Sequence, residues 1–237
     1  MVWGTNIQNN LAQLQRLHSI CTEWAQRNNV EFAPGKYQLI HLAKTHADRY
    51  MNAAFTAGPY TIEPQKTIRI LGVTIDQGLR WQEHIKQTAC KGQAAYLALA
   101  RLMGSTWGPK WKYAKLLYIA AVRPILTYAA PIWSIRYAGE PQPKSKLLPL
   151  IKVQNRCLRL IMGGYKRTPQ GALERESGTL PLPLFLHALS RQYASNTYMT
   201  PPSIQIQNRV RRAWHQYRPA THNQLPASSL TILRGEW

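Results

Sequence analysis

Acidic residues are scarce in this chain of 237 residues, which contains 10 Asp and Glu against 30 Lys and Arg. The two aspartates, Asp48 and Asp76, lie far apart, and no Asp-Asp pair occurs. Two-metal phosphoryl transfer needs several carboxylates that hold divalent ions a few ångströms apart. We therefore expect no such catalytic site within these residues.

Cysteine is also scarce, and Cys21, Cys90 and Cys157 are widely separated in the sequence. No Cys-x-x-Cys or Cys/His spacing typical of zinc binding occurs, and His41 with His46 lacks a third ligand, so we expect no metal site. Each cysteine falls within a helical pattern. This pattern predicts buried free thiols in a reducing, intracellular environment, either nuclear or cytoplasmic.

Long apolar runs are absent. The best candidate is interrupted by Arg123, Pro124 and Pro131, so no stretch reaches the roughly 20 apolar residues of a membrane span. Met1 is followed by neither the basic region nor the apolar core of a secretory signal. The sequence therefore predicts no association with a membrane.

Positive charge, in contrast, is abundant: the net charge is +20 and the pI is about 10.3. The excess arises from the shortage of acids, and a surface of this kind attracts polyanions through counterion release. Hydrophobic residues make up 45% of the chain, which is enough for a packed core. We expect contact with nucleic acid; the alternative is a decayed reading frame that was never selected for binding.

The first 80 residues predict one helix and several strands. The helix is expected to begin after Asn6 or Asn9 and to end near residues 28–29. Its apolar stripe consists of Leu11, Leu14, Leu17, Cys21 and Trp24. Residues 37–42 predict a strand, and residues 60–62 are expected to pair with residues 68–75 as an antiparallel hairpin. Residues 43–59 carry little pattern and predict a loop.

Residues 81–199 predict a series of helices. One apolar stripe runs to Gly104, and another ends at Gly163. The stripes consist of Ile85, Ala89, Gly92, Tyr96, Leu99 and Met103, and of Leu147, Leu150, Ile151, Gln154, Leu158 and Ile161. Pro124 and Pro131 are expected to break the intervening helix into two or three pieces. A short helix ending at Gly178 and a helix over residues 184–198 complete the series.

These patterns predict an α+β fold, in which a small antiparallel sheet with one helix precedes a helical bundle. We expect three parts: residues 1–80, residues 81–199, and a basic, flexible tail over residues 200–237. Polar residues and prolines dominate the tail.

Two strings of the sequence are similar to a known family. FAPGKYQLIHL, residues 32–42, and ILGVTIDQGLRWQEHI, residues 70–85, resemble the end of the palm and the start of the thumb of a reverse transcriptase. The type is that of non-LTR (LINE-like) retrotransposons of fungi. Residues 117–133 resemble its thumb helices, and the similarity covers about residues 1–190. The resemblance implies a palm remnant over residues 1–80 and a thumb over residues 81–199.

The family is an RNA-directed DNA polymerase that uses Mg²⁺ and deoxynucleotides. Its aromatic-x-Asp-Asp catalytic loop comes just before a segment similar to this N-terminus. The resemblance therefore implies a C-terminal fragment that lacks the catalytic aspartates. We expect this chain alone to have no polymerase activity and no cofactor, but to bind nucleic acid. The alternatives are a basic helical nucleic-acid-binding protein without polymerase ancestry, and a decayed retroelement product without function.

Two positions gain a role from the resemblance. It implies that Lys36 lies near the triphosphate of an incoming nucleotide, where a lysine could protonate the departing pyrophosphate. Without the carboxylates, a solvent-facing lysine beside a turn is the favoured interpretation. Leu71 and Gly72 match the hairpin that holds the primer end, the primer grip. From the residues alone, a bulge that merely shapes the hairpin is equally compatible.

Several basic groups predict contact with a phosphate backbone. Lys152, Arg156 and Arg159 share the helix face opposite the apolar stripe, and no acid lies between Glu140 and Glu174 to pair with them. Further candidates are Lys110, Lys112 and Lys115, Lys166 and Arg167, and Arg209, Arg211 and Arg212. The neighbouring Trp107 and Trp111 are expected to be core anchors instead of base-stacking platforms. The expected partners are RNA, DNA or an RNA–DNA hybrid.

Overall fold

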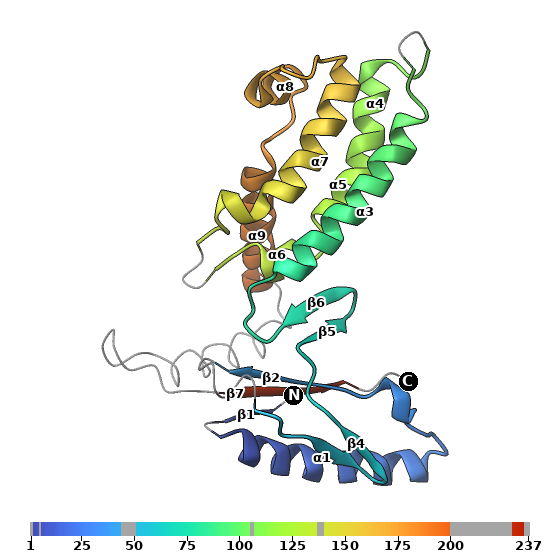
Figure 1. Ribbon diagram of the computed structural model, residues 1–237, viewed down its shortest axis with the longest axis vertical. Coiled ribbons are helices and arrows are strands. Elements are labelled where there is room, and N and C mark those ends of the chain that lie inside the picture. The colour runs from blue at the N-terminus through green and yellow to red at the C-terminus, as the bar shows by residue number, and fades with distance from the viewer. Residues whose placement is uncertain are drawn as a thin grey trace, which may run out of the picture. The chain divides into compact units, whose positions relative to one another are not determined.

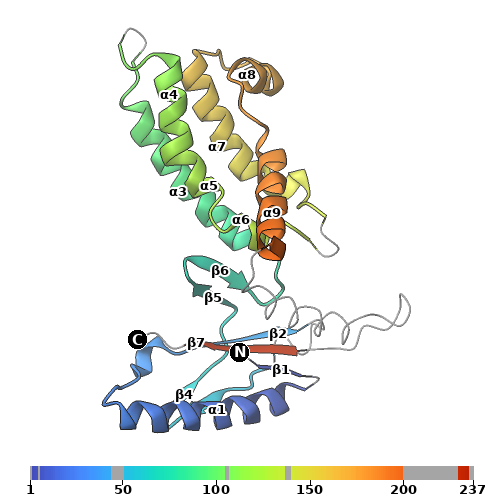
Figure 2. The ribbon, with the colours of Figure 1, turned by 180° about the vertical axis from the view of Figure 1, so that it is seen from behind.

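The chain folds into two compact units, and each is described by itself. The computed structural model describes residues 2–4, 6–43, 51–104, 107–136, 140–199 and 229–234. The first unit comprises Met1–Trp81 with Val210–Trp237, and the second comprises Gln82–Arg209. Antiparallel strands in the first unit and helices in the second confirm the predicted α+β fold class (Figures 1 and 2).

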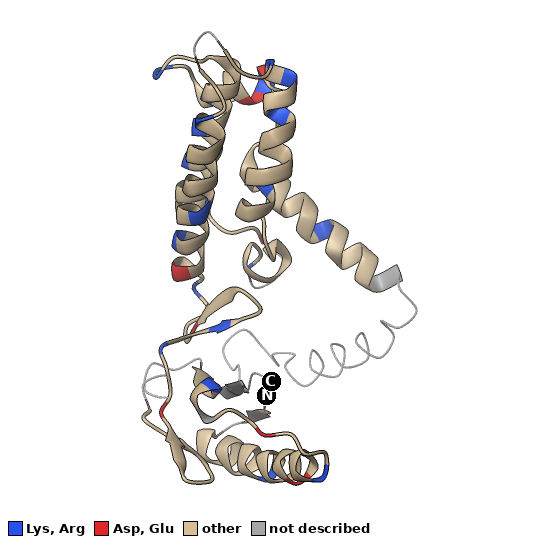
Figure 3. Cartoon of the chain, turned by 90° about the vertical axis from the view of Figure 1, so that its right-hand side faces the viewer, with Lys and Arg blue, Asp and Glu red and all other residues tan. Residues whose placement is uncertain are grey.

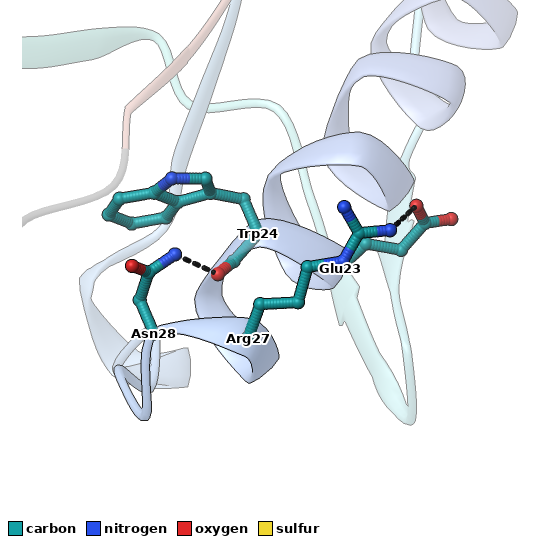
Figure 4. Close-up of polar contacts among 4 residues, drawn as sticks. All are labelled: Glu23, Trp24, Arg27 and Asn28. Atoms are coloured by element: carbon teal, nitrogen blue, oxygen red, sulfur yellow. Dashed lines mark hydrogen bonds and ion pairs between the residues drawn. The ribbon is translucent and has the colours of Figure 1, made fainter.

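Helix α1 (Ile7–Arg27) of the first unit begins and ends where the sequence predicted. The Asn6 side chain accepts a hydrogen bond from the backbone N–H of Gln8 at 2.9 Å, which satisfies a donor that the helix itself leaves unpaired. At the other end, the Asn28 side-chain amide donates to the Trp24 carbonyl at 2.8 Å (Figure 4). Polar caps at both ends therefore set the length of α1.

Only the first half of the predicted apolar stripe of α1 is buried. Leu14 is buried and Leu11 is partly buried, whereas Leu17, Cys21 and Trp24 are exposed. The 21 residues of α1 extend about 32 Å, while the six residues of the longest strand beside it extend about 20 Å. The helix is longer than the strands that it covers. One buried cluster of the first unit, which includes Leu14 of α1, consists of Val2, Leu14, Leu39, Phe55, Ala57 and Ile62.

The main sheet is completed by a strand from near the C-terminus. Its order is β1 (Val2–Gly4), β7 (Ser229–Arg234) and β2 (Gln38–Ala43), and β7 pairs antiparallel with both neighbours (Figure 1). The sequence predicted no strand beyond residue 200, because the partners of β7 are remote in sequence and no local pattern reveals such pairing. The rest of the predicted tail, residues 200–228 and 235–237, lies outside the described residues.

Two separate hairpins replace the predicted pairing of residues 60–62 with 68–75. β3 (Phe55–Ala57), within the predicted loop, pairs with β4 (Tyr60–Ile62), and β5 (Thr67–Ile70) pairs with β6 (Val73–Asp76). The predicted long strand was wrong because Leu71 and Gly72 both adopt positive φ, 47° and 82°, and reverse the chain between them. A 3₁₀ turn, η1 (Pro34–Lys36), precedes β2.

The named elements of the second unit are helical. Its elements are α3 (Gln82–Ala100), α4 (Trp111–Leu117), a π-helical turn η2 (Tyr118–Val122), α5 (Arg123–Leu126), α6 (Ala130–Trp133), α7 (Lys144–Met162), α8 (Gln170–Glu176) and α9 (Leu182–Met199). In both Figures 1 and 2, α3 and α7 lie side by side and run in the same direction. The predicted break before Pro131 is confirmed, since residues 127–129 interrupt the helix and Pro131 stands in the first turn of α6. Pro124 does not break the chain of helical residues: α4, η2 and α5 follow one another directly, and the π-helical turn η2 precedes the proline.

The core of the second unit combines apolar packing with one buried polar network. All six residues of the predicted α7 stripe are buried, and the left-handed Gly163 ends the helix as expected. Tyr118 Oη donates to Gln154 Oε1 at 2.8 Å, and Gln154 Nε2 donates to the Leu180 carbonyl at 3.2 Å. Burial raises the pKa of Tyr118 to about 12, so the phenol stays protonated and available as a donor.

The three cysteines are free, but only Cys157 is buried, and burial raises its pKa to about 12. Cys21 and Cys90 are exposed, so the prediction of three buried thiols was wrong for two of them. Helical periodicity places a residue on a helix but does not tell which part of the helix a partner covers. Within the described ranges, no helix combines the length and the apolarity that a bilayer crossing requires.

Candidate nucleic-acid interface

The α3–α7 pair carries three exposed cations along one edge. Arg156 of α7 donates from Nη1 to Gln93 Oε1 of α3 at 2.5 Å, which brings these two positions to the same level. Lys152 lies one turn earlier on α7, and Lys86 lies two turns before Gln93 on the same face of α3. All three cations are exposed. Because the helices run in the same direction, Lys152 lies about 6 Å and Lys86 about 10.5 Å along the helix axes before the level of Arg156 and Gln93. We call Arg156, Lys152 and Lys86 the basic row.

Lys86 was missed by the sequence analysis. Lys86 lies off the apolar stripe of its helix, and this position does not distinguish it from the other solvent-facing residues. Only the packing of α3 against α7, which includes the Arg156–Gln93 hydrogen bond, places Lys86 near the level of Lys152 on the neighbouring helix. No local pattern in the sequence predicts that α7 packs at this position.

Arg159 differs from the two basic residues with which the sequence grouped it. It is half-buried, and its Nη2 donates to the Thr168 carbonyl at 3.3 Å. This bond ties the end of α7 to the turn that precedes α8. Its guanidinium is therefore engaged in holding the fold, while Lys152 and Arg156 remain at the surface.

The charge excess is concentrated in the second unit. Residues 82–209 contain 18 Lys and Arg but only four acidic residues, Glu83, Glu140, Glu174 and Glu176. Figure 3 shows Lys and Arg along its helices and at its upper end, with few acidic positions between them. An ion pair is seen in the first unit, where Arg27 lies 3.9 Å from Glu23 (Figure 4). The helical unit thus has far more cations than its own acids could neutralise.

The predicted group of Lys110, Lys112 and Lys115 surrounds the start of α4. Lys110 is the N-cap residue, Lys112 lies over the ring of Trp111 at 5.8 Å, and Lys115 Nζ donates to the Gly178 carbonyl at 3.3 Å. Trp107 and Trp111 are 64% and 46% exposed, so the prediction that they are core anchors was wrong. Trp107 belongs to the connection that leads into α4, and Trp111 is the first residue of that helix.

The remaining predicted cations fall into two sets. Lys166 and Arg167 are exposed in the turn between α7 and α8, at the same end of the bundle as the start of α4 (Figures 1 and 2). Arg209, Arg211 and Arg212 lie outside the described residues.

The β5–β6 hairpin presents Leu71 at its tip. Ile70 pairs with Val73, so Leu71 and Gly72 alone form the turn, and positive φ at both residues makes it a type I′ turn. Gly72 adopts this conformation without cost, whereas a leucine there is strained by about 1–2 kcal/mol. The Leu71 side chain is nevertheless 82% exposed. Local strain that holds an apolar side chain in solvent is a feature of functional turns.

Lys36 is exposed at the end of η1, and its backbone N–H donates to the Ala33 carbonyl at 3.1 Å. It lies two residues before the start of β2, in the strand-and-turn context that the sequence predicted.

The described residues do not provide a site that fits Mg²⁺. Both carboxylate oxygens of Asp76 accept backbone N–H groups, from Arg80 at 2.9 Å and from Trp81 at 2.8 Å. Across the ranges that the structure describes, no three His, Cys, Asp or Glu side chains come together as metal ligands. His41 is buried, with Nε2 2.8 Å from the Ala53 carbonyl oxygen, and His46 and Asp48 lie outside the described residues. Asp76 therefore acts as a cap for the turn before α3.

Comparison with known proteins gives one informative match. Over 135 residues, 54% of the chain, the sequence is 26% identical to the 115 kDa protein of the type-1 retrotransposable element R1DM of Drosophila melanogaster. The match takes in 12% of that protein. No family model and no solved structure matches the chain. The similarity supports a retroelement origin for this sequence.

Proposed function

We propose that this chain is the nucleic-acid-holding part of a non-LTR retrotransposon reverse transcriptase. The observation that carries the proposal is the basic row, Lys86, Lys152 and Arg156, on a helical unit with few acids. A retroelement origin is consistent with it, since a polymerase of such an element must hold RNA, DNA and their hybrid. The strings over residues 32–42 and 70–85 supply the likeness to the palm and thumb of that enzyme class.

The basic row suits a phosphate backbone in three respects. Its cations stand at three successive levels along two packed helices, so that one strand could contact them in succession. The hydrogen bond to Gln93 holds the Arg156 side chain in place, which lowers the entropy lost when it contacts a phosphate. Few acidic side chains are available to compete with phosphates for these cations. Backbone contacts of this kind carry no base information, so binding should be independent of sequence.

The hairpin tip is proposed to approach the end of a nucleic-acid strand. Gly72 has no Cβ and allows close approach to a sugar or phosphate, and Leu71 offers an apolar side chain to a terminal base or sugar. The strained, exposed conformation of Leu71 favours this role over that of a bulge that merely shapes the hairpin.

These residues are not proposed to catalyse polymerisation by themselves. Chain extension requires paired carboxylates for divalent ions, and the sequence has two widely separated aspartates. Lys36 would have a catalytic role only next to such a site. A primer-extension assay of the purified chain with Mg²⁺ or Mn²⁺ should give no template-dependent product; product that survives repurification would refute this part of the proposal.

Binding itself is tested by titrating the chain into labelled RNA–DNA hybrid and single-stranded RNA over a range of salt concentrations. We expect the affinity to fall linearly on a double-logarithmic plot, with similar values for unrelated sequences. If the chain binds no nucleic acid even at low salt, the interpretation as a decayed product without function replaces this one. If it binds well but its hairpin substitutions leave strand-end binding unchanged, a general basic nucleic-acid-binding protein is the better description.

A further inference from the structure

Two tryptophans project from the end of the helical bundle where α4 begins. Trp107 lies in the connection before α4 and Trp111 is the first residue of that helix, with the N-cap residue Lys110 between them in the sequence. Large indole rings are usually buried because each removes much apolar surface from water. Exposure of two of them within five residues therefore calls for a ligand that covers aromatic faces.

Trp107 is held in place, although it is exposed. The Gly104 backbone N–H donates to the Trp107 carbonyl at 2.9 Å, which closes the turn after α3. The indole lies directly against Gly104, and a Cβ at that position would overlap the ring. Gly108, with φ of 124°, then turns the chain into α4. One part of the ring is thus seated on the glycine while most of its surface faces solvent.

Cations accompany these tryptophans in sequence and at the same end of the bundle. Lys112 lies 5.8 Å from the centre of the Trp111 ring, and Lys110 is exposed between the two tryptophans in sequence. Lys166 and Arg167 are exposed in the turn at the same end of the bundle (Figures 1 and 2). Exposed aromatic faces bordered by positive charge match the chemistry of unpaired bases joined by phosphates, because bases stack on rings while cations follow the backbone.

We propose that Trp107 and Trp111 form a stacking platform for the unpaired bases of a single-stranded nucleic acid, with Lys110 and Lys112 beside its phosphates. This rests on the proposed function and adds a preference that the basic row alone would not give. The basic row contacts any backbone, whereas the platform takes only bases that are free of a duplex.

The test compares oligothymidylate with a duplex of equal phosphate number, both fluorescently labelled, in anisotropy titrations of the full chain. Trp107→Ala is expected to weaken oligothymidylate binding about 5- to 100-fold, the range for loss of one stacked base. Duplex affinity should change less than twofold, because base faces in a duplex are already covered. Trp107→Phe retains an aromatic face and should recover most of the affinity.

A matched control is available in α1. Trp24 is 50% exposed, similar to Trp107 and Trp111, but lies in the other unit, so Trp24→Ala should leave oligothymidylate binding unchanged. Gly104→Ala should weaken oligothymidylate binding as Trp107→Ala does, because the added methyl group would displace the Trp107 indole without removing it. If Trp107→Ala fails to fold, Trp111→Ala and Trp107→Phe read out the same contact.

The outcomes separate the platform from the proposed function. Two results would overturn the platform and leave the basic row intact, provided that binding remains salt-dependent. In the first, the tryptophan variants lose equal affinity for oligothymidylate and for duplex. In the second, they lose affinity for neither. The platform would also be overturned if the original chain sediments as a dimer and the Trp107→Ala variant as a monomer with unchanged oligothymidylate affinity. The rings would then form a contact between two copies of the chain. Absence of any nucleic-acid binding overturns both proposals.

Discussion

Arg156 of α7 donates a 2.5 Å hydrogen bond to Gln93 of α3, a residue 63 positions earlier in the chain. The bond joins two parallel helices at their surface and places Lys86 of one helix near the level of Lys152 on the other. A basic row that spans two helices is the structural basis for the proposed contact with a phosphate backbone. It also changes which residues should be substituted, since Arg159 is engaged with the Thr168 carbonyl and Lys86 is not part of any sequence-based group.

The first prediction concerns the basic row. Changing Lys86, Lys152 and Arg156 together to Ala should lower the slope of log affinity against log salt by about two to three units, at ~0.7–0.9 per lost contact. Thermal stability should change little, because all three side chains are exposed. The same removal of three charges in the first unit, at Arg16, Arg27 and Lys66, serves as the control and should leave the slope nearly constant. Equal effects of the two triple variants would show that net charge alone governs binding.

The second prediction concerns the hairpin tip. Asn tolerates positive φ better than Leu and favours type I′ turns, so Leu71→Asn should stabilise the hairpin by up to about 1 kcal/mol. If Leu71 contacts a strand end, the same change should weaken binding to a hybrid with a recessed end while internal hybrid binding stays constant. Thermal melting and competition between the two hybrids measure both effects. Weaker folding together with unchanged strand-end binding would assign Leu71 a purely structural role.

The third prediction concerns the contact between α3 and α5. A Cβ at Gly92 would overlap the buried side chain of Leu126 and lie 3.4 Å from Val153 Cγ1. Alanine gains about 1 kcal/mol of helix propensity over glycine, but overpacking of a dense core costs about 1–3 kcal/mol. Gly92→Ala should therefore destabilise the second unit, as measured by denaturant unfolding. Gly171→Ala in α8, where no atom lies within 4 Å of the added methyl, should instead be neutral or stabilising.

The fourth prediction concerns pH. Burial, and secondarily the charge of Lys91, lowers the pKa of His84 below its ordinary value of 6.5. The unfolded chain therefore takes up a proton at higher pH than the folded chain does. Stability from this residue is complete above pH 6.5 and is lost as the pH falls below it. Thermal melting between neutral and mildly acidic pH should show this decline.

Substitution isolates the contribution of His84. His84→Gln removes the titrating ring and should flatten the decline, although part of it should persist because burial also lowers the pKa of His41 and His18. An identical decline in His84→Gln and the original chain would contradict the assignment.

The fifth prediction concerns strand β7. Removing residues 229–237 takes the central strand from the sheet, and β1 and β2 then lose the partner that each has there. Amide hydrogens of Gln38–Ala43 should exchange faster in the truncated chain, because their inter-strand hydrogen bonds are gone. The helical unit should keep its exchange pattern. Unchanged protection in β2 would show that β7 contributes no hydrogen bonds to the sheet in solution.

Local chemistry made much of the fold predictable. Asn6 caps α1, the stripe from Leu147 to Ile161 is buried, Gly163 ends α7, and a break precedes Pro131, all as the sequence indicates. Each of these features depends on residues within a few turns of one another. The same short range explains why the helical class and the basic character of residues 82–209 could be predicted.

The features that the sequence predicted wrongly, or did not predict, depend on residues that are distant in sequence. The strand pattern alone misplaced the hairpin, because leucine is an unusual residue at positive φ; only the resemblance to the primer-grip hairpin pointed to Leu71 and Gly72. Trp107 and Cys90 carry the same apolar chemistry whether a neighbour covers them or not, and the structure leaves both exposed. Lys86 was overlooked because its role depends on α7.

The sequence by itself determined where α1 begins and ends, where α7 ends, the α+β class and the charge of the chain, since capping, periodicity and composition act locally or in sum. Tertiary structure alone decided that β7 joins β1 to β2, that Arg156 meets Gln93, and that two tryptophans face solvent. Those relationships arise when loop closure brings remote residues together and packing selects which faces are covered.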